Sequence, residues 1–240
     1  MINIKLTDRD IKLMHDLYSN VFLSFEQIRR EHFKNCATST VYNRLSKLIR
    51  TNIIETINVN IKANYLLPKD VGVIYSLSKF GLIRLKEYWH REIQRIVPAP
   101  INLSCLSHDL LLTDVIRRLK RKYNCHVANT KIMNTSGINY EQVPDAIVFE
   151  SSNNERWAIE LELTAKSNLR YREIVSNYST SNLFEKVLYI TKDESIHKKI
   201  GGIISGYGSQ FNIEDDTGKF EFMGLKDFLL EQQSEVLCEL

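Results

Sequence analysis

A strand, a polar turn and a second strand can be traced between residues 143 and 164, and this hairpin constrains the fold of the 240-residue chain most strongly. The first segment, 143–149, is apolar except for the Pro-Asp pair at its start. A run of polar turn formers follows at 151–155, and residues 156–164 then alternate polar and apolar side chains. Alternation with period two is typical of a strand, so the sequence predicts a β-hairpin.

The predicted hairpin gathers acidic side chains. Residues two apart in a strand project to the same face, so Glu160, Glu162 and Thr164 are expected on one face. Lys166 joins them if the strand continues that far. Asp145 and either glutamate would offer the oxygen ligands that a hard divalent cation such as Mg²⁺ prefers. The sequence leaves open which glutamate is the second acid.

The Pro-Asp pair and the Glu-Leu-Glu triplet resemble the motif of the PD-(D/E)XK nuclease superfamily. The resemblance implies that Asp145 and Glu160 or Glu162 hold the metal, and that a lysine two residues after the second acid assists the attacking water. Here Glu162 or Thr164 occupies that lysine position, and the nearest lysine is Lys166. Two hypotheses follow: a nuclease relic that contacts DNA or protein, and an active endonuclease that uses Lys166.

The N-terminal part of the chain shows helical spacing followed by strand alternation. Thr7 is a cap for a first helix, and Ser24 is a cap for a second. The third helix begins near Thr38 and carries a stripe of apolar residues, which includes Val41 and Leu45. The predicted helices begin at 8, 25, 38 and 78, the last ending near 96, and the predicted strands cover 57–61 and 73–77.

This order resembles bacterial winged-helix DNA-binding domains over residues 5–90. In that fold the third helix enters the major groove with the face opposite its apolar stripe. Small hydroxyls and an Asn read base edges there, whereas Lys and Arg mostly hold phosphates. The residues expected to contact DNA are Thr38, Ser39, Tyr42, Asn43, Ser46, Lys47 and Arg50, with Lys62 and Lys69 in the wing.

Charge is distributed unevenly along the chain. The formal net charge is +3. Residues 1–100 contain 16 Lys and Arg against 9 Asp and Glu, whereas residues 101–240 contain 16 against 20. A basic surface in the N-terminal part favours a polyanion such as double-stranded DNA as the partner.

Composition indicates a folded protein of a reducing compartment. Hydrophobic residues make up 43% of the chain, with only 9 Gly and 4 Pro, so a core is expected. No apolar run approaches the ~18 residues of a membrane helix, and the start lacks the regions of a signal peptide. We therefore expect a cytoplasmic protein without membrane contact. The cysteines are scattered and are expected to be reduced thiols: Cys36, Cys105, Cys125 and Cys238.

Two prolines, Pro98 and Pro100, mark a domain boundary. The expected organisation is a winged-helix domain at 1–97, a linker at 98–104 and a second domain at 105–240. In the second domain helices are predicted at 107–123, 167–180, 194–205 and from 225, and strands near 126–133, 143–150, 156–164, 187–190 and 220–223.

The predicted fold class is therefore an α+β winged helix-turn-helix domain followed by an α/β PD-(D/E)XK nuclease-like domain with an αβββαβ core. In nucleases of this fold the first helix commonly supplies another acid, for which Asp109 and Asp114 are candidates. Further polar residues near the motif are His108 on that helix and Arg170, Tyr171 and Arg172 on the helix after the motif.

The whole chain resembles the replication-relaxation family of bacterial plasmids and mobile elements. The segments that carry this resemblance include the winged helix, the Ser-His-Asp-Leu-Leu-Leu-Thr-Asp helix and the Glu-Leu-Glu-Leu-Thr-Ala-Lys-Ser strand end. It implies a DNA-binding accessory protein of replication or mobilisation, with a relaxase or replication protein as partner. DNA binding would need no cofactor, and Mg²⁺ would be needed only by an active nuclease site.

Other interpretations remain open at this point. The chain would be a metal-dependent endonuclease targeted by the winged helix, or a simple transcriptional repressor or antitoxin. The helix at 78–96 carries more apolar surface than a short surface helix needs. That surface either packs against its own domain or forms a contact between two subunits, and a homodimer is expected.

Overall fold

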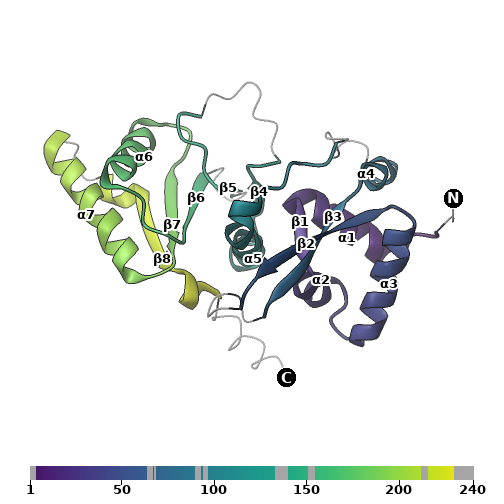
Figure 1. Cartoon of the computed structure of the whole chain (residues 1–240). Coiled ribbons are helices and arrows are strands. Elements are labelled where there is room, and N and C mark those ends of the chain that lie inside the picture. The colour runs from purple at the N-terminus through teal and green to yellow at the C-terminus, as the bar shows by residue number, and fades with distance from the viewer. Residues whose placement is uncertain are drawn as a thin grey trace. The chain divides into compact units, whose positions relative to one another are not determined.

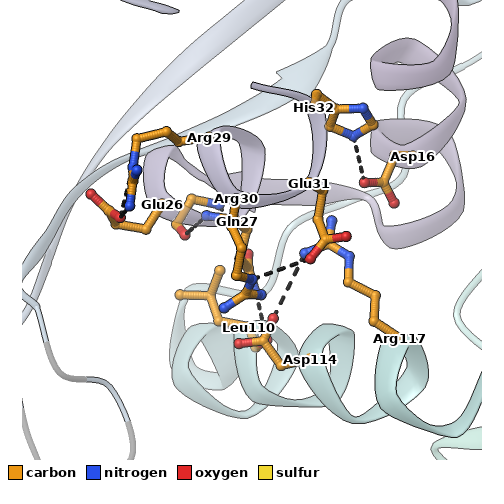
Figure 2. Close-up of polar contacts among 11 residues, drawn as sticks. Asp16, Glu26, Gln27, Arg29, Arg30, Glu31, His32, Leu110, Asp114 and Arg117 are labelled. Atoms are coloured by element: carbon orange, nitrogen blue, oxygen red, sulfur yellow. Dashed lines mark hydrogen bonds and ion pairs between the residues drawn. The ribbon is translucent and has the colours of Figure 1, made fainter. Parts of the chain in front are cut away.

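A computed structural model describes residues 4–63, 67, 69–89, 93, 97–132, 140–150, 155–211 and 216–229. The chain divides into two compact units, Met1–Leu110 (unit 1) and Leu111–Leu240 (unit 2). The division falls inside a helix, later than the predicted linker at 98–104. Within unit 1, the side-chain amide of Gln27 donates to the carbonyl oxygen of Leu110 at 2.8 Å (Figure 2).

Unit 1 combines helices with a small antiparallel sheet (Figure 1). The helices form where the apolar spacing predicts them, because each buries one stripe and leaves the other face polar. Its elements are α1 (Asp8–Asn20), β1 (Phe22–Ser24), α2 (Phe25–His32), α3 (Thr38–Arg50), β2 (Ile54–Ile61), β3 (Val71–Leu77), α4 (Lys79–Lys86), η1 (Leu103–Cys105) and the start of α5 (Leu106–Tyr123).

The strand order in this sheet is β1-β3-β2, and both pairs are antiparallel. The middle strand β3 places Tyr75 opposite Leu23 of β1 and Ile74 opposite Ile57 of β2. The strand β1 was not predicted, because three residues are too few for a periodic pattern. The hairpin of β2 and β3 has an irregular register between Asn58 and Ile61, consistent with a β-bulge.

Capping and side-chain hydrogen bonds fix the helices of unit 1. Thr7 and Ser24 both form capping boxes, in which the side chain three residues later returns a hydrogen bond. A hydrogen bond between His32 Nε2 and Asp16 Oδ2, 2.9 Å apart, joins α2 to α1 (Figure 2). The predicted helix from Ser78 to residue 96 was too long: α4 ends at Lys86, a turn follows, and most of 90–96 lies outside the described residues.

Unit 2 is built on one mixed sheet. The order of helices and strands agrees with the prediction, although several ends differ. Beyond α5, its elements are β4 (His126–Asn129), β5 (Ala146–Phe149), β6 (Arg156–Glu162), α6 (Asn168–Thr180), β7 (Lys186–Thr191), α7 (Glu194–Phe211), η2 (Asp216–Lys219) and β8 (Phe220–Gly224), with helical residues again at 225–229.

The five strands lie in the order β4-β5-β6-β7-β8. The first three form an antiparallel meander, whereas β7 and β8 each run parallel to the preceding strand in this order. Helices α6 and α7 lie together on one side of the sheet (Figure 1). Their buried side chains, which include Ile174 and Ile200, form a core with Ala158 and Val187 of the sheet. This helical layer covers the face on which Glu160 and Glu162 project.

Several predicted strands and helices were wrong at their ends. The strand β5 begins at Ala146 rather than 143, and β2 begins at Ile54 rather than 57. The strand β4 stops at Asn129 rather than 133, because the chain turns at Thr130. The strand β6 stops at Glu162, and residues 163–164 form a bend. The helix α7 continues to Phe211 rather than 205.

Two further predictions can be compared with the structure. None of the helices in the described ranges combines the length and the apolar character needed to cross a membrane. Three of the cysteines, Cys36, Cys105 and Cys125, are free thiols, and Cys238 lies outside the described residues.

Candidate nucleic-acid interface and buried carboxylate cluster

The helix α3 has two chemically distinct faces. Val41, Leu45 and Leu48 are buried against unit 1, as their spacing predicts. The opposite face is polar, and none of the 13 residues of α3 is acidic. Of the predicted DNA contacts, Thr38, Ser39, Tyr42, Asn43, Lys47 and Arg50 are exposed and Ser46 is half-buried.

The polar face offers hydrogen-bonding and charged groups on one helix. Side chains at i, i+3, i+4 and i+7 share a face, so Ser39, Asn43, Ser46 and Arg50 form its centre. Lys47 lies beside them in the last turn of the helix. No side chain caps the start of α3, whose N-cap residue is Ala37. The face therefore presents amide and hydroxyl groups with two cations and no opposing acid of its own helix.

An arginine that the sequence did not single out holds α3 in place. The Arg44 side chain donates from Nε to Asp10 Oδ1 at 2.8 Å and forms an ion pair with Oδ2 of the same carboxylate. It also donates to the carbonyl oxygen of Lys5 at 3.1 Å. Burial alone raises the pKa of Asp10, but the hydrogen bonds from Arg44 and Thr7 outweigh it and hold the pKa below its ordinary value.

Two aromatic rings meet beside the polar face. The ring of Tyr42 on α3 stacks on the ring of Phe25, the first residue of α2, with centroids 4.3 Å apart and planes 14° apart. Burial, and next the nearby Tyr42, raises the pKa of Tyr75 on β3. The stacked rings thus connect α2 to α3 beside the polar face.

The predicted wing lysines are exposed but form ion pairs. Lys62 Nζ lies 3.0 Å from Asp70 Oδ2, and Asp70 Oδ1 accepts the backbone N–H of Ala63 at 2.7 Å. Lys69 Nζ lies 3.1 Å from Glu26 Oε1. More than half of each lysine side chain is exposed, so water screens both pairs and they contribute little to stability.

Asp145 lies where the β5–β6 pairing ends. Its backbone N–H donates to the carbonyl oxygen of Ile159 at 2.9 Å, and its Oδ2 accepts the backbone N–H of Leu161 at 2.8 Å. The side chain thus replaces a backbone carbonyl as the last acceptor of this strand pair. Because Ala146 is paired with Ile159, continuing the register by one residue places Asp145 opposite Glu160.

Glu160 is buried and held by hydrogen bonds. The hydroxyl of Tyr178 on α6 donates to Glu160 Oε1 at 2.5 Å, and the Gln142 amide donates to the same oxygen at 3.2 Å. Burial, and next the charge of Asp145, raises the pKa of Glu160 to about 8. Burial and the charge of Glu160 in turn raise the pKa of Tyr178. Near neutral pH Glu160 is therefore largely protonated.

Glu162 is also buried, and it binds the lysine that the sequence singled out. Lys166 Nζ forms an ion pair with Glu162 Oε1, and the Tyr171 hydroxyl donates to Oε2 at 3.4 Å. The strand does not reach Lys166, so its contact with Glu162 comes from the turn that follows. The expected extension of the strand face to Thr164 is wrong, because Thr164 lies in the bend and is exposed.

Tyrosines surround the two glutamates. Burial, and next the charge of Glu162, raises the pKa of Tyr171 to about 12. On β7, Tyr189 is paired with Glu160, and its buried hydroxyl has no hydrogen-bond partner within the described part of the chain. Burial, and next the charges of Glu160 and Glu162, raises its pKa well above the ordinary value. Sequence reasoning missed Tyr178 and Tyr189. The seven-residue spacing of Tyr171 and Tyr178 on one helix was the signal for the first of them.

The strand pairing brings the predicted metal ligands to one part of the sheet, but in their present hydrogen-bonded arrangement they do not form a metal site. In the described ranges no group of three or more His, Cys, Asp and Glu side chains is placed to hold a metal ion. Asp145, Glu160 and Glu162 are each engaged by protein donors, namely Leu161, Tyr178 and Lys166. These residues do not fit a bound Mg²⁺ without a rearrangement of their hydrogen bonds.

The weaker candidates have local partners. On α5, His108 Nδ1 lies 3.2 Å from Asp109 Oδ1. Asp114 lies 3.7 Å from Arg117, one turn along the same helix. On α6, Arg170 pairs with Glu173 at 3.2 Å and Arg172 is exposed, whereas Tyr171 points inward and is buried.

Comparison of the chain with protein-family models, with curated proteins and with solved structures gave no match.

Proposed function

We propose that this chain is a DNA-binding accessory or regulatory protein of plasmid or mobile-element replication or mobilisation, acting in the cytoplasm. One observation carries the proposal: α3 presents a polar face with Asn43, Lys47 and Arg50, contains no acid, and is fixed to α1 by the Arg44–Asp10 ion pair. Rigid presentation of amide and cationic groups suits major-groove recognition. Double-stranded DNA is the proposed partner, and no cofactor is needed for binding.

The proposed folds are a winged helix-turn-helix for unit 1 and a PD-(D/E)XK nuclease-like domain for unit 2. The first is supported by α2 and α3 preceding a β2–β3 hairpin, with β1 completing the sheet. The second is supported by the order α5-β4-β5-β6-α6-β7, in which β7 runs parallel to β6. In this proposal unit 2 is a nuclease relic that contacts DNA or a partner such as a relaxase or replication protein.

Binding to DNA tests the proposal. A preferred duplex is selected from a random pool, and fluorescence anisotropy then measures the affinity for it and for unrelated duplexes at several salt concentrations. Asn43→Ala should reduce the preference, because a base contact is lost. Lys47→Ala and Arg50→Ala should weaken binding to all duplexes. Each should also reduce, by about 1, the steepness with which the logarithm of the binding constant falls with the logarithm of the salt concentration.

A surface charge on unit 2 gives the control. Lys198 on α7 pairs with Glu194 in an exposed i, i+4 contact. Lys198→Ala should therefore leave both the preference for the selected duplex and the salt-dependent affinity unchanged. Equal affinity of the wild type for the selected and the unrelated duplexes would refute the proposal. Preferential binding to origin DNA supports the role in replication, whereas binding at the promoter of its own gene alone would favour a repressor or antitoxin.

A homodimer formed through α4 is part of the proposal. Phe80, Ile83 and Tyr88 lie in or just after this helix and are exposed, while Leu82 and Leu85 are buried within unit 1. A contiguous exposed apolar patch marks a contact with another protein, and we propose that these three side chains form such a patch. Light scattering of the purified chain should give a dimer, and Ile83→Glu should shift it to a monomer. A monomeric wild type would refute this part.

A Mg²⁺-dependent endonuclease is the second candidate. It is favoured by the position of Lys166 against Glu162 and of Asp145 opposite Glu160. It would require Tyr178 and Lys166 to release the glutamates. Supercoiled and nicked DNA are incubated with the wild type and with Asp145→Ala in Mg²⁺ or Mn²⁺. Cleavage by the wild type and not by the variant would establish this candidate in place of a relic.

A further inference from the structure

The stacked rings of Phe25 and Tyr42 differ in their exposure. Phe25 is half-buried and packs against the hydrophobic core of unit 1. Tyr42 covers it on the outer side, and half of the Tyr42 residue, 50%, is exposed. Phe25 is therefore the anchor, and Tyr42 is the ring that the molecule presents to solvent.

The position of Tyr42 on α3 places it at the edge of the polar face. Successive residues of a helix are turned by about 100°, so Tyr42 lies roughly midway between the buried Val41 and the outward Asn43. Ser46 follows it one turn later on the same face. Its ring forms one border of the face, next to the groups that offer hydrogen bonds.

Chemistry distinguishes this ring from its neighbours. Amides, hydroxyls and cations interact with the donors and acceptors of the major groove, whereas the face of an aromatic ring offers mainly apolar contact. The major groove carries one apolar feature, the 5-methyl group of thymine. A ring already fixed by stacking also loses little rotational freedom when it binds.

We propose that Tyr42 is a specificity-determining residue that contacts the 5-methyl group of one thymine, and that Phe25 is the positioning residue that holds its ring. The inference rests on the proposed DNA-binding function and names the base feature that it reads. In this proposal the packing of Phe25 against Tyr42 fixes the ring that recognises thymine, so the stack contributes to the sequence preference.

Substitution of uracil for thymine isolates the methyl group. In the selected duplex each thymine is replaced in turn by deoxyuridine, which removes one methyl group and leaves all donors and acceptors in place. At one position wild-type binding should weaken by about fourfold, the value of one buried methyl group. Tyr42→Ala should bind the two duplexes equally, because the contacting ring is gone.

The positioning role of Phe25 has its own readout. Phe25→Leu keeps an apolar anchor but removes the stack, so the thymine-to-uracil ratio should fall while the affinity for unrelated duplexes stays. Phe25→Tyr keeps an aromatic ring and should retain the ratio. Leu169→Ala, a change at a 70% exposed residue of α6, is the control for loss of a surface apolar group and should alter neither quantity.

The outcomes separate this inference from the function on which it rests. If the wild type prefers no duplex, both fail. If a preferred duplex exists but no uracil substitution weakens binding, or if Tyr42→Ala keeps the wild-type ratio, the DNA-binding proposal stands and the assignment of Tyr42 is overturned. A ratio unchanged in Phe25→Leu overturns the role of Phe25. Circular dichroism verifies that each variant is folded.

Discussion

The guanidinium of Arg44 on α3 lies against the carboxylate of Asp10 on α1, and the Asp10 side chain is fully buried. Replacement of Arg44 by Met would leave that carboxylate buried without its cation. We expect Arg44→Met to lower the free energy of unfolding of unit 1 by about 3 kcal/mol, the lower end for a broken buried pair, because Arg44 is partly exposed. Chemical denaturation measures this loss.

The two tryptophans make the measurement specific to each unit, since Trp89 belongs to unit 1 and Trp157 to unit 2. In a Trp157→Phe background, fluorescence reports unit 1 through Trp89, which packs against its core. Lys62→Ala, which breaks an exposed pair within unit 1, should change stability by less than about 0.5 kcal/mol. A similarly small effect of Arg44→Met would contradict the structural role of the buried pair.

The Asp10 carboxylate also predicts an acid dependence for unit 1. Its pKa is lowered in the folded state below the ordinary value of 3.8, so the folded state favours the charged form. The stability that this group contributes is present above about pH 4 and is lost as the pH falls through the lowered pKa. In Asp10→Asn this part of the decline should be missing. Denaturation midpoints between about pH 2 and 6 check it, and parallel curves for variant and wild type would refute it.

The raised pKa of Glu160 predicts the opposite pH dependence for unit 2, whose stability should fall as the pH rises. Burial, and next the charge of Asp145, raises its pKa from 4.5 to about 8 in the folded state. The folded protein then holds a proton that the unfolded chain releases, so the contribution is complete below about pH 4.5 and is lost as the pH rises towards 8. Glu160→Gln, which mimics the protonated form, should flatten this decline. Trp157 fluorescence in a Trp89→Phe background follows it.

A carboxylate at the surface serves as the control for Glu160. Glu194→Gln changes an exposed residue of α7 and should keep the wild-type slope between pH 5 and 8. Retention of that slope in Glu160→Gln would show that other groups cause it.

A close backbone approach at Gly81 predicts a packing defect. A Cβ atom at this position of α4 would lie 2.0 Å from the carbonyl oxygen of Ile53, so the backbone would have to move. Gly81→Ala should destabilise unit 1 by about 2–3 kcal/mol, in the range of overpacked cores. Urea denaturation with Trp89 as the reporter measures the change.

Gly202 is the matched control because a Cβ atom there meets no atom within 4 Å. It lies inside α7 and is exposed, so Gly202→Ala should stabilise unit 2 by about 0.5–1 kcal/mol through its helix propensity. A neutral or stabilising Gly81→Ala would mean that α4 shifts away from Ile53 without cost.

Much of the fold could be predicted from periodicity, because helices and strands that bury one face carry a pattern. The stripe of α3 at Val41, Leu45 and Leu48 is an example. The strand β1 was missed, since its three residues are defined only by pairing with β3. Strand ends were also missed, because the bend after Glu162 depends on tertiary contacts and not on local pattern.

The candidate sites differed in predictability for a similar reason. Exposure of the α3 face follows from its own sequence, whereas the environment of Glu160 depends on what covers the sheet. Polar residues that alternate with apolar ones normally face water, yet Glu160 and Glu162 are buried under α6. Their polar partners, Tyr171 and Tyr178, lie on another element. The sequence of the strand β6 alone therefore does not predict that its glutamates bind tyrosines of α6.

The two hydroxyl contacts of α6 restrict how that helix can move on the sheet. Tyr178 donates to Glu160 and Tyr171 to Glu162, so the helix is attached at two points seven residues apart. A slip of one residue would turn α6 by about 100° and withdraw both hydroxyls, leaving two buried acids without these donors. Apolar packing alone tolerates several helix positions. The two tyrosine hydrogen bonds thus select a single position of α6 on the sheet among those that apolar packing would allow.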